Sequence, residues 1–106
     1  MRRYQGDWID GKRSGNGVQR WPDGRVYQGR WSGGKRTGLG VMEFPNGDRY
    51  DGQFLDDSYH GNGSLTYGDG RVYNGEFSHG VYEGRGNLTL SNGTWQAGEW
   101  RDGQLV

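Results

Sequence analysis

The sequence contains no cysteine and only two prolines among its 106 residues. The absence of cysteine excludes disulfide bonds, zinc–thiolate sites and thiol redox chemistry. No apolar run approaches the roughly 20 residues that a membrane-spanning helix needs. The N-terminal segment MRRYQGDW lacks the apolar core of a signal peptide. We therefore expect a soluble, cytoplasmic chain.

Hydrophobic residues are also scarce, at 29% of the chain. Glycine is abundant instead, with 23 residues. Such a composition would suggest disorder if aromatic residues were rare. The chain has five tryptophans, seven tyrosines and three phenylalanines, so its apolar surface is concentrated in a few large rings. This composition predicts a thin, regular structure rather than a thick globular core.

A 23-residue period runs through the whole sequence. One column of residues in phase is Gly6, Gly29, Gly52, Gly75 and Gly98. A second column holds Trp8, Trp31, Phe54, Phe77 and Trp100, and a third holds Gly24, Gly47, Gly70 and Gly93. Tyr4, Tyr27, Tyr50 and Tyr73 lead four units, and Gln96 takes the fifth position. We interpret residues 1–106 as one repeat array, with repeats at about 4–26, 27–49, 50–72 and 73–95 and a partial repeat at 96–106.

Each repeat is predicted to form a β-hairpin. The first strand has the pattern Tyr-x-Gly-x-Trp/Phe, whose period of two places the aromatic residues and the glycine on one face. The second strand is predicted to follow the Gly-x-Gly pair, as in Gly40–Phe44. An Asp-Gly or Asn-Gly pair then turns the chain into the next repeat. The predicted fold class is all-β, an elongated single-layer antiparallel meander curved by strand twist.

The strand glycines have a predicted role in this sheet. Glycine inside a strand normally weakens it. An aromatic ring that lies flat across the bare backbone of a neighbouring glycine compensates for the missing side chain. Rings and glycines would thus alternate to fill one face of the sheet.

These columns resemble the MORN (membrane occupation and recognition nexus) repeat family. Repeat one carries the pattern through Tyr4, Gly6, Trp8, Gly11, Lys12, Gly15 and Gly17, and repeat two through the residues 23 positions later. Repeat three departs from the Gly-Lys turn with Asp57 and Ser58, and repeat four with Val81 and Tyr82. The resemblance implies an elongated β-hairpin ribbon that acts as a scaffold or interaction module. It also implies an association with acidic phospholipids, which the loss of lysine in repeats three and four weakens for that half.

The aromatic face is the first candidate binding surface. Aromatic surfaces of this kind bind an apolar helix or peptide of a partner, although in a thin ribbon the same rings also form the core. Trp21, Phe44, Tyr67 and Leu90 vary most among the repeats and form the more adaptable column. The predicted partner-binding residues are Trp8, Trp21, Trp31, Phe44, Phe54, Tyr67 and Phe77.

The basic turns are the second candidate. Lys12, Arg13, Lys35 and Arg36 are predicted to project from one edge, where they would attract acidic lipid headgroups or simply remain solvated. Further basic residues in the same half are Arg2, Arg3, Arg20, Arg25, Arg30 and Arg49. Nothing matches a motif for nucleic-acid binding.

Candidate catalytic residues are few. His60 and His79 are the only histidines, both near predicted turns and outside any metal-ligand spacing. Asp23 and Asp69 stand where other repeats have asparagine, which favours turn formation over acid–base chemistry. We therefore predict no enzymatic activity, no metal and no cofactor.

Charge is divided unevenly along the chain. Residues 1–53 hold ten basic and six acidic residues, a net charge of +4, and residues 54–106 hold three basic and seven acidic residues, a net charge of −4. The terminal strands of an open ribbon have unpaired backbone groups. Together these features predict a homodimer that forms through the ribbon ends.

Three functions remain open at this level. The first is a non-catalytic interaction scaffold that binds a protein or peptide along an aromatic-lined groove. The second is a peripheral membrane protein that binds acidic phospholipid or phosphoinositide through the basic N-terminal turns. A carbohydrate or choline binder is a third, which the phase of the Tyr-x-Gly-x-Trp pattern disfavours.

Overall fold

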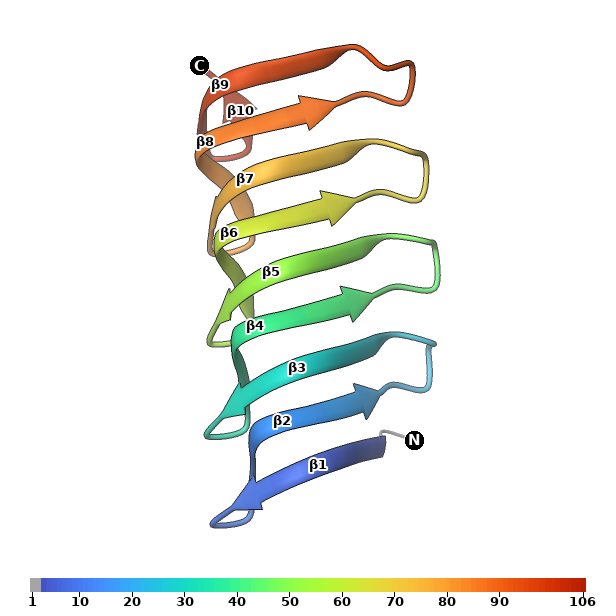
Figure 1. Cartoon of the computed structure of the whole chain (residues 1–106), viewed down its shortest axis with the longest axis vertical. Helices are drawn as coiled ribbons and strands as arrows, with labels where there is room; N and C mark the ends of the chain where they lie inside the picture. Colours follow the sequence, from blue (N-terminus) through green and yellow to red (C-terminus); the bar gives the residue numbers. More distant parts are fainter. Residues whose placement is uncertain (1–2) are drawn as a thin grey trace.

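The structure is a computed structural model that describes residues 3–106; Arg2, one of the basic residues named above, lies outside this range. Over the described range it contains ten strands and no helix, and hence no helix that could span a membrane. All strands pair in sequence order in one antiparallel sheet (Figure 1). The single-layer meander is therefore confirmed, with principal extents of 45 × 24 × 16 Å. The strands are β1 Arg3–Ile9, β2 Lys12–Arg20, β3 Val26–Ser32, β4 Lys35–Glu43, β5 Arg49–Leu55, β6 Ser58–Thr66, β7 Val72–Ser78, β8 Val81–Thr89, β9 Trp95–Arg101 and β10 Gln104–Leu105.

The Asp-Gly and Asn-Gly pairs form the longer turns, as predicted. In the first of them the Gly24 N–H donates to the Trp21 carbonyl oxygen at 3.1 Å, and the Asp23 carboxylate accepts from the Arg25 N–H at 3.0 Å. Gly24 has a φ of +101°, a conformation that glycine adopts without steric cost. The corresponding glycines of the next three turns, Gly47, Gly70 and Gly93, share this conformation.

The shorter turns differ from the prediction. Asp10 and Gly11 reverse the chain with φ values of +49° and +76°. Strand β2 therefore begins at Lys12, and β4 begins at Lys35, well before the Gly-x-Gly pair. The prediction that the second strand starts after that pair was wrong, because a two-residue turn is enough to reverse the chain. Lys12 and Arg13 are consequently strand residues rather than turn residues.

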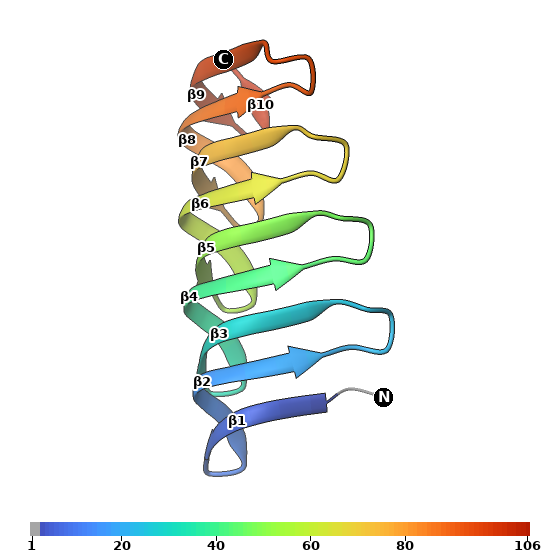
Figure 2. The same ribbon diagram turned by 45° about the vertical axis from the view of Figure 1, so that its right-hand side comes forward.

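A bulge in each hairpin bends the sheet. Gly6 pairs with Gly17 and the next residue, Asp7, pairs with Ser14, so that Gly15 and Asn16 have no residue opposite them in β1. The same shift recurs in the β3–β4, β5–β6 and β7–β8 pairs. Beyond the bulge the strand ends that lead to the short turns fold back behind the longer parts of the strands (Figures 1 and 2). Bulges thus add a sharp bend to the gradual twist that the sequence predicted.

The core lies on the face toward which the aromatic residues point. Tyr27, Tyr50 and Tyr73 are fully buried, and each ring lies across a pair of glycines on adjacent strands. A Cβ atom added to Gly40 would overlap the ring of Tyr27. The hydroxyl of Tyr27 donates to the Arg30 carbonyl oxygen at 2.8 Å, which holds the ring over that backbone. The predicted alternation of rings and bare glycines is confirmed.

Candidate functional site

Four of the five residues in the Trp/Phe column are part of the core; the exception is Trp8. Each of its interior members lies between the tyrosines of two successive repeats: the Phe54 ring is 5.0 Å from both Tyr27 and Tyr50, in edge-to-face geometry. Three of the residues predicted to bind a partner are therefore buried, with 3–4% of their surface exposed: Trp31, Phe54 and Phe77.

A second aromatic column, Trp21, Phe44 and Tyr67, remains half-buried. These residues pack against the core from just beyond the ends of β2, β4 and β6. Trp8 in the first hairpin is 57% exposed, and among the described residues it packs against a single aromatic ring, Tyr4, at 5.0 Å. The variable column and Trp8 are thus the predicted aromatic residues that keep accessible surface.

One position beside these columns is arginine in the first two hairpins and tyrosine in the third and fourth. It is the residue that pairs with the Trp/Phe column across each short hairpin, namely Arg13, Arg36, Tyr59 and Tyr82. The Arg13 guanidinium lies 4.4 Å from the centroid of the Trp31 ring, which is cation–π geometry. Tyr59 instead stacks on Tyr50 at 3.9 Å, and Tyr82 on Tyr73 at 3.8 Å. The sequence analysis did not identify either tyrosine as a site residue. The sequence does carry a signal for them, because tyrosine replaces arginine at this position in repeats three and four.

Three adjoining hollows connect these residues on the aromatic face. The first has a volume of about 500 Å³ and lies between Trp8, Arg13 and Gly34. The second, of about 230 Å³, shares Arg13 with the first. The third, of about 280 Å³, shares Arg36 with the second and extends to Phe44 and Tyr59. We call these three hollows, together with Tyr67, the next residue of the variable column after Phe44, the aromatic groove; arginine and aromatic side chains line each of the three hollows.

Asp57 and Arg36 form an ion pair inside the groove. Their carboxylate oxygen and Nε are 3.0 Å apart, and the same oxygen accepts from the Arg36 backbone N–H at 2.8 Å. Burial raises the pKa of the Asp57 carboxyl, but the N–H and guanidinium of Arg36 outweigh it and hold that pKa below its usual value. Asp57 therefore stays ionised and remains bound to the guanidinium of Arg36.

The four predicted lipid-binding residues do not share one environment. Lys12 and Lys35 are exposed, whereas Arg13 and Arg36 are half-buried. Arg13 donates to the Gln19 side-chain oxygen and, at 3.0 Å, to the Gly34 carbonyl oxygen. Both arginines thus line the aromatic groove and are half-buried, whereas both lysines are exposed and Lys12 also lines the first hollow.

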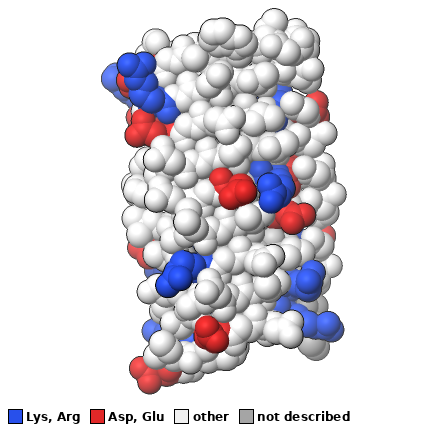
Figure 3. Space-filling model, in the orientation of Figure 1, with Lys and Arg blue, Asp and Glu red and all other residues white. Residues whose placement is uncertain are grey.

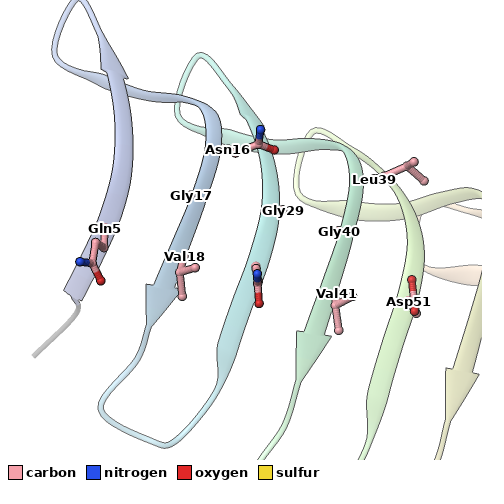
Figure 4. Close-up of a pocket in the computed structure, with 10 residues that line it drawn as sticks. Gln5, Asn16, Gly17, Val18, Gly29, Leu39, Gly40, Val41 and Asp51 are labelled. Carbon is pink, nitrogen blue, oxygen red and sulfur yellow. The ribbon is translucent and has the colours of Figure 1, made fainter.

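The opposite face of the sheet carries a larger but chemically plain hollow. It has a volume of about 630 Å³ and is lined by Val18, Gln28, Val41 and Asp51, together with glycines of the adjoining row (Figure 4). These residues form the cross-strand row next to the tyrosine row, and adjacent rows point to opposite faces. Figure 3 shows the face of the molecule seen in Figure 1, where charged side chains of both signs are scattered between wide uncharged areas. The aromatic groove is the better candidate because aromatic and guanidinium groups converge there.

The histidines lie near each other at the third and fourth repeats. The His60 and His79 rings are 6.3 Å apart, His60 within β6 and His79 at the following short turn. In the described part of the chain, residues 3–106, no three His, Cys, Asp or Glu side chains lie close enough together to hold a metal ion. This pair therefore has no third ligand from the described chain.

The two ends of the ribbon are strands β1 and β10. Exposed apolar residues lie at both ends: Trp8 in β1, and Trp95, Leu105 and Val106 near the last strand. Pairing of two copies through these ends stays a prediction.

An open sheet that repeats one hairpin and lays its aromatic residues along one face defines a β-hairpin repeat protein. The chain belongs to the MORN repeat family, whose model matches residues 4–24, 27–49, 50–70, 73–95 and 97–106. A comparison with curated proteins found no match. MORN repeats are generally associated with protein or membrane-lipid binding, and the family is one of binding scaffolds rather than enzymes.

Proposed function

We propose that this array is a non-catalytic interaction module that holds a peptide segment of a protein partner in the aromatic groove. The observation that carries the proposal is the half-buried column Trp21, Phe44 and Tyr67, which lies over a core that the buried rings already complete. Partly exposed Trp, Tyr and Arg side chains are the types that dominate binding energy at protein interfaces.

The spacing of the column suits an extended peptide. Two strands per repeat place equivalent residues roughly 10 Å apart along the ribbon, and an extended peptide advances about 3.3 Å per residue. Every third residue of the peptide would therefore meet the next repeat. A segment of roughly 12 residues would span four repeats on this basis.

A random library of 12-residue peptides displayed on phage tests this function. We expect the protein to enrich peptides whose affinity falls roughly 30-fold when Phe44→Ala and Tyr67→Ala are combined, as the loss of two interface side chains worth about 1 kcal/mol each implies. Fluorescence anisotropy with the enriched peptides measures the change, and circular dichroism checks that the variant keeps its β structure.

The matched control removes apolar side chains from the opposite face. Leu39→Ala combined with Val41→Ala should leave peptide affinity unchanged, because Val41 lines the opposite hollow and Leu39 is 65% exposed there. Equal loss of affinity in both double variants would reject the aromatic groove as the binding surface.

Binding to acidic membranes is the second candidate function, favoured by the exposure of Lys12 and Lys35 on neighbouring hairpins. Each basic residue near an anionic surface contributes about 1 kcal/mol. Sedimentation with phosphoinositide-containing vesicles should therefore weaken roughly 30-fold when Lys12→Ala and Lys35→Ala are combined. Arg20→Ala with Arg49→Ala, two exposed residues at the other end of the strands, is the control, and an equal loss there would reject a lysine-specific lipid site.

A further inference from the structure

Four residues occupy the same position in successive short turns: Gly34, Asp57, Gly80 and Gly103. Each donates its backbone N–H to the carbonyl oxygen of the residue 21 positions earlier, at 3.0–3.1 Å. All four have similar positive φ values, from +72° to +85°. This position therefore has the same local geometry in all four turns, and only Asp57 has a side chain there.

That side chain binds the neighbouring arginine. The Asp57 carboxylate accepts from both the backbone N–H and the Nε of Arg36, at 2.8 and 3.0 Å. The Nη2 of Arg36 donates to the Asp57 carbonyl oxygen at 3.1 Å. Arg36 therefore offers a carboxylate-binding site in which a backbone amide and a guanidinium act together, and the chain fills this site itself.

A related site occurs at Arg13 without the carboxylate; there the guanidinium also donates to the Gln19 side-chain oxygen. Arg13 pairs with Trp8 as Arg36 pairs with Trp31, and its Nη2 donates to the Gly34 carbonyl oxygen at 3.0 Å, as Arg36 does to Asp57. Because residue 34 is glycine, no side chain reaches the guanidinium from this turn. A Cβ added to Gly34 would meet only the Cβ of Lys12, at 3.9 Å, so the space for a side chain is open.

This open space belongs to the first hollow of the aromatic groove, which Lys12, Arg13, Trp8 and Gly34 line. Lys12, which is exposed and also lines this hollow, adds a second positive charge to it. Further along the groove the corresponding position is held by Tyr59 and Tyr82, whose rings are stacked on the core. Arginine at this position is therefore confined to the first two hairpins, and tyrosine takes its place in the third and fourth.

We propose that Arg13, with the backbone N–H beside it, binds a carboxylate side chain of an acidic peptide in the way that Arg36 binds Asp57. This inference rests on the proposed peptide-binding function and names the partner's chemistry: an acidic residue over Arg13, followed along the groove by apolar residues that contact Phe44 and Tyr67. At Arg36 the bound group is the carboxylate of Asp57. This favours an acidic side chain over a phosphate as the ligand of Arg13.

The decisive variant is Gly34→Asp, which places a carboxylate where Asp57 has one. The introduced carboxylate would bind Arg13 and close the site from within. In selections from the random 12-residue library we expect acidic residues to be enriched by the unmodified protein and no longer by this variant. Replacing the acidic residue of an enriched peptide by its amide should weaken binding to the unmodified protein about tenfold, as the loss of a charged hydrogen bond implies, and should not affect binding to Gly34→Asp.

A matched control separates site blocking from added negative charge. Gly103→Asp introduces the same residue at a turn with φ of +81°, against +84° at Gly34, but opposite Tyr82 rather than an arginine. It should select the same acidic peptides as the unmodified protein. Asp57→Gly provides the reverse test, because it frees Arg36 and should select peptides with a second acidic residue about three positions from the first, one repeat along the groove.

The outcomes distinguish this inference from the function on which it rests. Peptides that require Phe44 and Tyr67 but show no acidic preference would overturn the carboxylate site and leave the peptide groove in place. A library that yields no peptide dependent on Phe44 and Tyr67 would reject the groove itself. If Gly34→Asp instead abolished sedimentation with phosphoinositide vesicles and left acidic peptide selection unchanged, the Arg13 site would be a phosphate site and the proposal would be wrong.

Discussion

Gly63→Ala is expected to destabilise the array by about 3 kcal/mol, near the upper end of the range for overpacking a filled core. Gly63 pairs with Gly52, and the Tyr50 ring covers both. An added Cβ would lie 2.5 Å from the Cζ atom of Tyr50. The ring has no room to retreat, because Tyr59 stacks on it at 3.9 Å and Phe54 and Phe77 contact it edge-on. Urea denaturation followed by circular dichroism measures the change.

Two controls identify the clash as the cause. Ser64→Ala, in the next residue of the same strand, should change stability by less than about 0.5 kcal/mol. In a Tyr50→Ala background, Gly63→Ala should lose most of its effect, because the colliding ring is gone; this is a double-mutant cycle with a large coupling energy. Similar effects of Gly63→Ala in both backgrounds would show that the ring does not determine the need for glycine.

The array is also expected to unfold in a single steep transition between about pH 10 and pH 12, since the reference pKa of tyrosine is about 10. Burial raises the pKa of Tyr4 and of five further tyrosines above that value, to about 12 for Tyr27, Tyr59 and Tyr73. Burial also raises the pKa values of Tyr50 and Tyr82. A raised pKa stabilises the folded state fully below pH 10, and this contribution is lost as the pH rises toward the folded-state value. Each such tyrosine removes about 1.4 kcal/mol per pH unit above pH 10, so that five remove about 7 kcal/mol per unit.

The free energy lost over one pH unit is therefore comparable to the whole free energy of unfolding of a small domain, about 5–15 kcal/mol. Absorbance at tyrosinate wavelengths and circular dichroism should therefore change together in a pH titration. Tyr59→Phe combined with Tyr82→Phe keeps both stacked rings and removes two of the ionising hydroxyls. This variant should unfold at higher pH and with a shallower dependence. Gradual ionisation of all tyrosines near pH 10 with retained β structure would contradict the prediction.

The local structure of each repeat could be predicted with good accuracy from the sequence. The alternation Tyr-x-Gly-x-Trp requires that both rings and the glycine share a strand face, and Asp23-Gly24 and its counterparts have the backbone preferences of a tight turn. Both expectations depend on residues a few positions apart. For the same reason the sequence alone marks Trp21, Phe44, Tyr67 and Leu90 as the column that varies among the repeats.

The candidate site could be predicted only in part, because its contacts join different repeats. Arg13 meets Gly34 and Arg36 meets Asp57, pairs that are 21 residues apart. In the sequence, Asp57 is a departure from a Gly-Lys turn; in the structure it is the ligand of an arginine in the preceding hairpin. The burial of Trp31, Phe54 and Phe77 was equally undecided, since the same rings could have been either core or contact surface until their neighbours were in place.

The sequence by itself therefore determined the repeat, its strands, its longer turns and the covering of glycine by tyrosine, because each follows from the period of two along a strand and from the conformational freedom of glycine. The tertiary structure decided where the sheet bends, which aromatic column is buried and which arginine is left without a carboxylate. Those outcomes depend on the register between strands and on the side chains that neighbouring repeats bring together, and no single repeat contains that information.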